Sequence, residues 1–169
     1  MEALGRPQPT ASHACDLAMS TTDQSMDFAR ALGRLYVSLR DHSYEEFERA
    51  LLKFGAEQMG SVGELEALET HRRIAEELLM GAYVRNVAWP QFSGALERIR
   101  ALGYTNVERQ AHVACLFARW AHRRHEREDE ARKALDLAEQ ELDRTGPSHL
   151  LGQQVRSSIE KTRMDTGYL

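Results

Sequence analysis

Apolar residues recur at every third or fourth position along most of the chain, which is the spacing of amphipathic helices. The clearest pattern lies between residues 106 and 145, where two apolar stripes flank an acidic turn at residues 126–129. The first stripe consists of Val113, Leu116, Phe117 and Trp120, and the opposite side of that helix carries the small residues Ala111, Ala114, Cys115 and Ala118. The second stripe consists of Ala131, Ala134, Leu135, Ala138 and Leu142. This pattern predicts two antiparallel helices in close contact, the first of them central to the fold.

The remaining apolar stripes predict an all-α protein. Further helices are expected to begin at or just after Thr22, Ser43, Ser61, Pro90 and Ser148. Three pairs have capping-box spacing, in which each side chain binds a backbone N–H of the other residue: Ser43 with Glu46, Ser61 with Glu64, and Thr105 with Glu108. Pro90 suits the first turn of a helix. Gly60 and Gly103 suit helix ends, Gly60 in the left-handed conformation.

The predicted helices also form a repeat. A shift of 48 residues superposes Gly33 on Gly81 together with the apolar faces around them, and a further shift of 36 superposes Ile99 on Leu135. Three helix hairpins followed by a terminal helix are the organisation of a helical solenoid, in which each unit buries its apolar face on the next.

Three segments resemble the tetratricopeptide-repeat (TPR) pattern: Leu32-Gly33-x-x-Tyr36, Met80-Gly81, and Glu130-Ala131 with Leu135 and Ala138. The likeness covers residues 23–142. The repeats are degenerate, because their spacings differ from the regular period of about 34 residues and Arg119 stands where the third unit would have a glycine. Three repeats after a leader, closed by a helix, also resemble the type III secretion translocator chaperones. These resemblances imply three antiparallel hairpins stacked as a TPR-like superhelix plus a C-terminal capping helix.

Length and composition suit one globular domain. The chain has 169 residues, of which 42% are apolar and 28% charged, and a net charge of −4. It therefore has enough apolar residues for a core and no global attraction to nucleic acid or anionic lipid. We expect a flexible leader at residues 1–21, a single helical-repeat domain at 22–163 and a flexible tail at 164–169.

The sequence predicts a cytoplasmic protein without membrane association. No segment approaches the roughly 18 apolar residues of a membrane span, and residues 1–10 lack the basic flank and apolar stretch of a signal peptide. Cys15 lies in the polar leader and Cys115 in a predicted helix, so a disulfide framework is not expected.

The TPR resemblance implies a concave groove lined by the first helix of each hairpin. The residues expected to face it are Arg30, Arg34, Arg85, Asn86, Trp120, Arg123 and Arg124. Because the planar fork of arginine binds carboxylates through two hydrogen bonds, we expect a non-enzymatic adaptor or chaperone that binds an acidic or C-terminal segment of another protein, without a cofactor. Charge reversal at Arg85 and Arg123 is expected to abolish this binding and leave the fold intact. A homodimer is compatible with this pattern.

The alternative for the same residues is a solvated face. In that case Arg123 and Arg124 pair with the acidic residues at 126–130, and Trp120 belongs to the core. Such exposed pairs contribute little to stability.

A metal protein or enzyme is the competing class. His112, Cys115 and His122 lie near one stripe of the same predicted helix, and imidazole and thiolate are ligands that zinc prefers. One straight helix cannot bring them to a single ion, so further ligands would have to come from elsewhere. The sequence contains no nucleophile elbow, phosphate-binding glycine loop or His-Glu-x-x-His motif, so catalysis is not expected.

Binding of RNA or DNA is a second alternative. Seven arginines are concentrated between residues 98 and 127, and phosphate binding requires clustered cations: Arg98, Arg100, Arg109, Arg119, Arg123, Arg124 and Arg127. The acidic residues of the same region dilute this charge, which makes nucleic acid a less favoured partner than protein.

Overall fold

The computed structural model describes residues 26–60, 63–104, 106–145 and 150–169. The chain divides into two compact units, Met1–Asp41 and His42–Leu169. The predicted helical-repeat domain at 22–163 spans parts of both units, and its extent stays a prediction. The predicted leader at residues 1–21 lies outside the described residues.

One helix, residues 26–38, makes up most of the described part of the first unit. Leu32 and Leu39 are its buried apolar residues. At the C-terminal end of the helix the Ser38 hydroxyl donates a hydrogen bond to the Leu35 carbonyl (2.8 Å). The helix therefore ends before Asp41, close to the predicted position.

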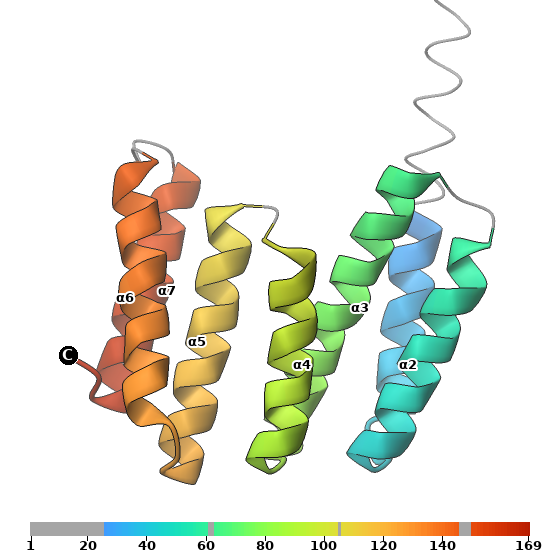
Figure 1. Ribbon diagram of the computed structural model, residues 1–169, viewed down its shortest axis with the longest axis horizontal. Coiled ribbons are helices and arrows are strands. Elements are labelled where there is room, and N and C mark those ends of the chain that lie inside the picture. The colour runs from blue at the N-terminus through green and yellow to red at the C-terminus, as the bar shows by residue number, and fades with distance from the viewer. Residues whose placement is uncertain (1–25, 61–62, 105, 146–149) are drawn as a thin grey trace, which may run out of the picture. The chain divides into compact units, whose positions relative to one another are not determined.

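The described part of the second unit is formed by six helices (Figure 1): α2 (Tyr44–Met59), α3 (Glu64–Val84), α4 (Trp89–Leu102), α5 (Val107–Arg124), α6 (Glu128–Arg144) and α7 (Leu150–Thr166). The described residues of both units contain no strand, which confirms the all-α class. None of the helices described is sufficiently long and apolar to cross a membrane.

Within the second unit, α3 and α5 each pack against at least three other helices. α3 packs against α2 and α4, α5 packs against α6 and α7, and α3 and α5 also contact each other. Figure 1 shows α2 at one end of the unit and α6 with α7 at the other, with α4 and α6 nearer the viewer than α3 and α7. Helix α5 is therefore covered on several sides, as the two-sided pattern of its sequence predicts.

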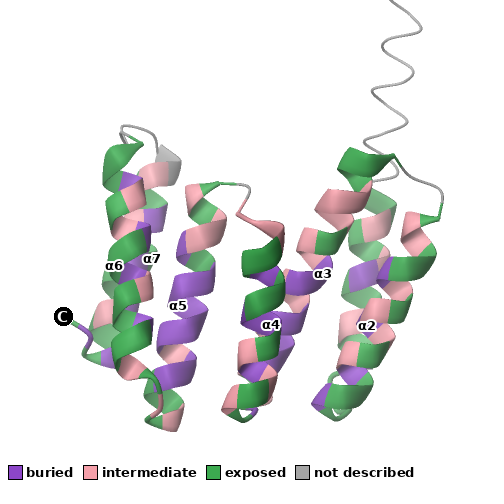
Figure 2. Cartoon of the chain, viewed as in Figure 1, coloured by how far each residue is buried: buried purple, intermediate pink, exposed green. Residues whose placement is uncertain are grey.

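The core of the second unit is aromatic where α4 meets α5. The Phe92 ring stacks on Trp120 with centroids 4.5 Å apart, and Trp89 stacks on Phe117 at 5.9 Å. Along α5 most residues from Ala111 onward are buried, and Figure 2 shows this helix largely in the colour of buried residues. These contacts fix α5 relative to α4.

The predicted helix ends are confirmed at three positions. Ser43 and Glu46 form the capping box of α2, with hydrogen bonds of 3.3 and 3.2 Å. Pro90 lies in the first turn of α4. Gly103 ends α4 with a φ of 73°, a conformation that favours glycine because it has no Cβ atom.

Three other predicted helix ends differ. Gly60 follows α2 in the right-handed conformation, so the left-handed prediction is wrong. The N-cap of α3 is Gly63, which has no capping side chain, and the predicted partner Ser61 lies outside the described residues. The N-cap of α5 is Asn106, whose side chain accepts a hydrogen bond from the Arg109 N–H (2.9 Å). The predicted cap, Thr105, lies outside the described residues, and asparagine is among the residues most favoured at this position.

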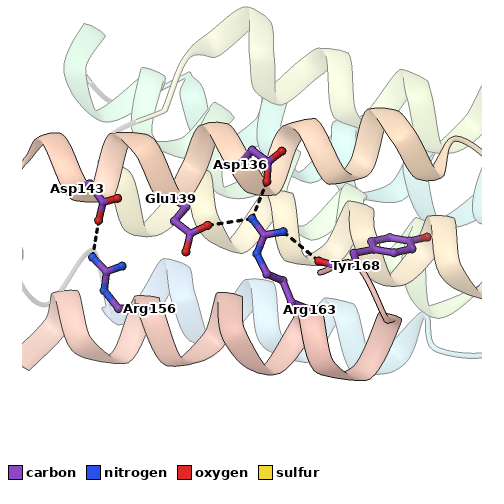
Figure 3. A network of polar contacts seen from close by, with 6 residues as sticks. All are labelled: Asp136, Glu139, Asp143, Arg156, Arg163 and Tyr168. Atoms are coloured by element: carbon purple, nitrogen blue, oxygen red, sulfur yellow. Dashed lines mark hydrogen bonds and ion pairs between the residues drawn. The ribbon is translucent and has the colours of Figure 1, made fainter.

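Ion pairs hold α7 against α6 (Figure 3). The Arg163 guanidinium donates to Asp136 (2.7 Å) and Glu139 (2.9 Å), and Arg156 donates to Asp143 (2.6 Å). All three acids lie on α6 at helical spacing, so they form one stripe that faces α7.

The end of the chain is packed, in contrast to the flexible tail predicted from residue 164. Helix α7 continues to Thr166, and Tyr168 is only 2% exposed. The Tyr168 carbonyl accepts a hydrogen bond from Arg163 (3.0 Å), and the Arg132 guanidinium lies 4.9 Å from its ring centroid. Burial, together with Glu128, raises the pKa of Tyr168 to about 12. The tail prediction missed this single aromatic anchor.

Candidate functional site

Five of the predicted groove residues gather at the C-terminal end of α3: Arg85, Asn86, Trp120, Arg123 and Arg124. The last carbonyls of a helix have no partner within the helix, and the helix dipole favours cations there. Arg85 and Arg123 donate to carbonyls in the last turn of α3, and Trp120 and Arg124 donate to carbonyls of the segment that follows it. The residues are therefore brought together, but as partners of the backbone.

Arg85 connects α3 to the segment before α2. Its Nε donates to the His42 carbonyl (2.9 Å) and its Nη1 to the Gly81 carbonyl (3.3 Å). The guanidinium carbon also lies 4.2 Å from the centroid of the Phe47 ring. These contacts give Arg85 a structural role, so its charge reversal is expected to disturb the fold as well as any binding.

Trp120 is a core residue. Its side chain is completely buried, and its indole N–H donates to the Val87 carbonyl (3.0 Å). A buried side chain offers no surface to a peptide. The structure thus supports the alternative interpretation of Trp120, and the groove interpretation of this residue is wrong.

Arg123 and Arg124 differ in their surroundings. Arg124 donates to the Asn86 carbonyl (3.1 Å) and pairs with Glu126 (3.2 Å), so an acid already occupies its guanidinium. Arg123 is exposed and donates to the Tyr83 carbonyl (3.0 Å), with its guanidinium carbon 4.3 Å from the Tyr83 ring centroid. Among the ion pairs of the described residues Arg123 has no acid. Its charge is therefore the more available of the two.

Asn86 has a φ of 50°, a left-handed conformation that asparagine tolerates better than most residues. It is exposed and closes the turn after α3 through its backbone.

The remaining predicted groove residues, Arg30 and Arg34, are exposed on the helix of residues 26–38 in the other unit. Their part in a common groove stays a prediction.

Next to Arg123, an open hollow of about 540 Å³ lies between α3, α5 and α7. Its lining comes from the ends of these three helices and from the residue after α5: Tyr83, Arg119, His122, Arg123, His125, Asp165 and Thr166. Two arginines and two histidines thus face one carboxylate. We call this space the basic hollow.

The carboxylate in the basic hollow is only loosely engaged. Asp165 lies 4.0 Å from the Arg119 guanidinium, at the limit of an ion pair, and both side chains are partly exposed. Exposed pairs of this kind are weak because water screens them. A carboxylate from another molecule can therefore compete for Arg119.

The imidazoles lie at the edge of the basic hollow nearest the α5–α6 turn. His122 is exposed and its ring lies edge-on to Tyr168, with centroids 6.0 Å apart. His125 has a φ of 55°, a left-handed conformation that costs free energy in any residue with a Cβ atom. Such strained positions in non-glycine residues are enriched at functional sites.

The sequence indicated Arg119 only as a candidate for nucleic-acid binding, and it did not single out His125 or Asp165. Arg119 lies one turn before Arg123 and on the same face of α5, which was a usable signal. Asp165 could not be predicted, because nothing in the sequence places the end of α7 beside α5.

The proposed metal ligands are not brought together. Cys115 is buried and its thiol lies 3.8 Å from the Ser158 carbonyl of α7, while His112 and His122 are exposed. Burial raises the pKa of the Cys115 thiol, which disfavours the thiolate that binds metals. Nowhere in the described ranges do three or more His, Cys, Asp or Glu side chains form a group able to hold a metal ion. The two histidines are separated by about 15 Å along the helix axis.

The arginines considered for nucleic acid are mostly paired with acids. Arg100 pairs with Glu97, Arg109 with Glu69 and Glu76, Arg124 with Glu126, and Arg127 with Glu130. Neighbouring carboxylates repel phosphate. These ion pairs therefore weaken the case for nucleic acid in this region.

Comparisons with known proteins give no family for this chain. No protein-family model matches it, and it matches neither a curated protein nor a solved structure at a significant level. The chemistry of the basic hollow is thus the basis for a proposed function.

Proposed function

We propose that this chain is a non-enzymatic interaction module, an adaptor or chaperone, that binds an acidic or C-terminal segment of another protein in the basic hollow. The observation that carries the proposal is the composition of the hollow, with two arginines and two histidines against one carboxylate. Its volume of about 540 Å³ lies within the range of roughly 300–1,000 Å³ that is typical of ligand pockets.

The two arginines have complementary parts in this proposal. Arg119 makes no hydrogen bond to the backbone in the described residues, so its donors are available to a carboxylate once the weak Asp165 contact gives way. Arg123 is held against the Tyr83 ring and carbonyl, which fixes its guanidinium before a ligand arrives. A cation held in place loses less conformational freedom on binding than a mobile one.

The helix packing supports a TPR-like architecture for this module. α3 pairs with α4 and α5 with α6, while α3, α5 and α7 contact one another in succession. In a TPR array the first helices of successive hairpins line the concave side, and the basic hollow is lined by α3, α5 and α7. The proposed ligand site and the proposed architecture therefore agree.

The test is a titration of the full chain with a fluorescently labelled, glutamate-rich peptide, followed by fluorescence anisotropy. We expect saturable binding that weakens as salt is added, because screening reduces the attraction between charges. Arg119→Glu is expected to weaken binding by about tenfold or more. Arg49→Glu is the matched control, since Arg49 is an exposed arginine on α2 that does not line the hollow.

Two outcomes contradict the proposal: absence of binding to the wild-type chain, or equal weakening by Arg119→Glu and Arg49→Glu. A version of the peptide with an amidated C-terminus separates the two forms of ligand. Unchanged affinity assigns the recognised group to acidic side chains, and reduced affinity assigns it to the terminal carboxylate.

A further inference from the structure

The opposite side of α5 carries a second hollow of different chemistry. It has a volume of about 180 Å³, lies between α4, α5 and α6, and is lined mainly by apolar groups, among them Leu96, Val113, Phe117 and Leu137. We call it the apolar hollow. A cavity of about 150 Å³ accommodates a benzene molecule, so this space is large enough for one aliphatic side chain.

Leu137 makes this surface unusual. It lies on α6 at the edge of the apolar hollow and is 56% exposed, whereas Leu96 within the hollow is 1% exposed. A single exposed leucine is ordinary on a protein surface. A protruding leucine beside a hollow that fits a leucine is self-complementary, which is the condition for a two-fold symmetric contact.

The charges beside these leucines are complementary as well. On α4, Leu96 is followed one turn later by Arg100, which also lines the hollow. On α6, Leu137 is followed one turn later by Glu141 on the same face. Both helices begin at the lower end of Figure 1 and run in the same direction. The two walls of the hollow therefore present the same arrangement with charges of opposite sign.

We infer that two copies of this chain associate through the apolar hollow, about a two-fold axis parallel to α4 and α6. The α6 helix of each copy then lies on α4 of the other. Leu137 enters the partner's hollow beside its Leu96, and Glu141 approaches the partner's Arg100. Arg100 pairs with Glu97 and Glu141 with Arg144, in exposed contacts that exchange easily.

The charge balance of whole helices favours the same arrangement. Apart from the three acids that face α7 (Asp136, Glu139 and Asp143), α6 carries four acidic and three basic residues, whereas α4 carries Arg98 and Arg100 against Glu97. A contact of α6 on α6 would bring like charges together, which is unfavourable. A contact of α6 on α4 brings opposite charges together twice, once on each side of the axis.

Analytical ultracentrifugation of the full chain tests this inference. The wild-type chain is expected to show a monomer–dimer equilibrium, and Leu137→Glu is expected to raise the dissociation constant by about thirtyfold, the effect of losing one central contact. Leu65→Glu is the matched control, because Leu65 is an 84% exposed leucine on α3 that does not line the hollow. It is expected to leave the equilibrium unchanged.

A charge exchange tests the orientation. Arg100→Glu and Glu141→Arg are each expected to weaken the dimer several-fold, and the double variant is expected to restore it. A wild-type chain that stays monomeric at every concentration, equal effects of Leu137→Glu and Leu65→Glu, or a double variant as weak as either single one would each overturn the inference. So would a monomer that binds an amphipathic helix of another protein in this hollow.

Discussion

The basic hollow and the apolar hollow lie on different sides of the same helix, α5, and differ in chemistry. Arg119, His122 and Arg123 face α3 and α7, whereas Val113, Ala114 and Phe117 face the space between α4 and α6. The difference shows how one central helix can serve two surfaces. Positions one turn apart share a face, so the charged and apolar residues of α5 separate without any change in the backbone.

The largest effect is expected from Trp120→Ala, because both hollows depend on the position of α5. Trp120 is completely buried, stacks on Phe92 and donates to the Val87 carbonyl. Its truncation is expected to lower the free energy of unfolding by about 3–5 kcal/mol. Urea unfolding followed by circular dichroism measures this change. A loss below about 1 kcal/mol would mean that the aromatic contacts do not fix α5.

Arg123 and Arg119 separate stability from binding within the basic hollow. Arg123→Gln removes a hydrogen bond to the Tyr83 carbonyl and the contact with its ring, so we expect the free energy of unfolding to fall by about 1–2 kcal/mol. Arg119→Gln removes only the weak contact with Asp165 and is expected to leave stability unchanged. Both should weaken binding of the acidic peptide. Equal thermal stability of the two variants would remove the structural role assigned to Arg123.

His125→Gly is expected to raise stability. The left-handed φ of 55° costs about 1 kcal/mol in a residue with a Cβ atom, and glycine adopts it freely. Loss of one imidazole from the basic hollow should at the same time weaken peptide binding. Thermal unfolding and the anisotropy titration measure these two opposite changes. A lower melting temperature would indicate that the His125 side chain stabilises the turn.

The smallest effect is expected from Asp165→Asn. This substitution removes the carboxylate that competes with a ligand for Arg119. Affinity for the acidic peptide should rise by about twofold to fivefold, since exposed pairs are worth less than about 1 kcal/mol. The same titration measures this gain. Weaker binding would show that Asp165 contributes to the site instead of competing with it.

Helices and several of their ends could be predicted because their signals are local. The Ser43 and Glu46 pair forms the cap that its spacing predicts, and Pro90 lies in the first turn of α4. The prediction of Thr105 as a cap is one residue away from the observed Asn106, because both residue types cap well and the sequence does not choose between them.

Packing between helices was less predictable, as two glycines illustrate. Gly33 and Gly81 occupy equivalent places in the sequence repeat, yet a Cβ atom on Gly81 would lie 2.1 Å from Phe47, whereas the space around Gly33 is open. The predicted repeat indicates where a small residue lies, but the aromatic ring that requires it at Gly81, that of Phe47, belongs to another helix.

The candidate site was predicted in part for the same reason. The TPR resemblance assigned both Arg123 and Trp120 to the groove, but their side-chain contacts differ. The buried Trp120 side chain donates a hydrogen bond to the Val87 carbonyl, whereas Arg123 is exposed and donates to the Tyr83 carbonyl. Such contacts join residues about thirty to forty positions apart, and the sequence alone does not specify them.

Backbone amide chemical shifts in ¹H–¹⁵N NMR spectra, recorded while the acidic peptide is added, test the central claim most directly. We expect progressive shifts at Tyr83, Arg119, His122, Arg123 and His125, with the amides of Tyr104, Ala134 and Leu137 on the other side of α5 unchanged. Shifts confined to Tyr104, Ala134 and Leu137, or no shifts at all, would contradict the assignment of the basic hollow as the ligand site.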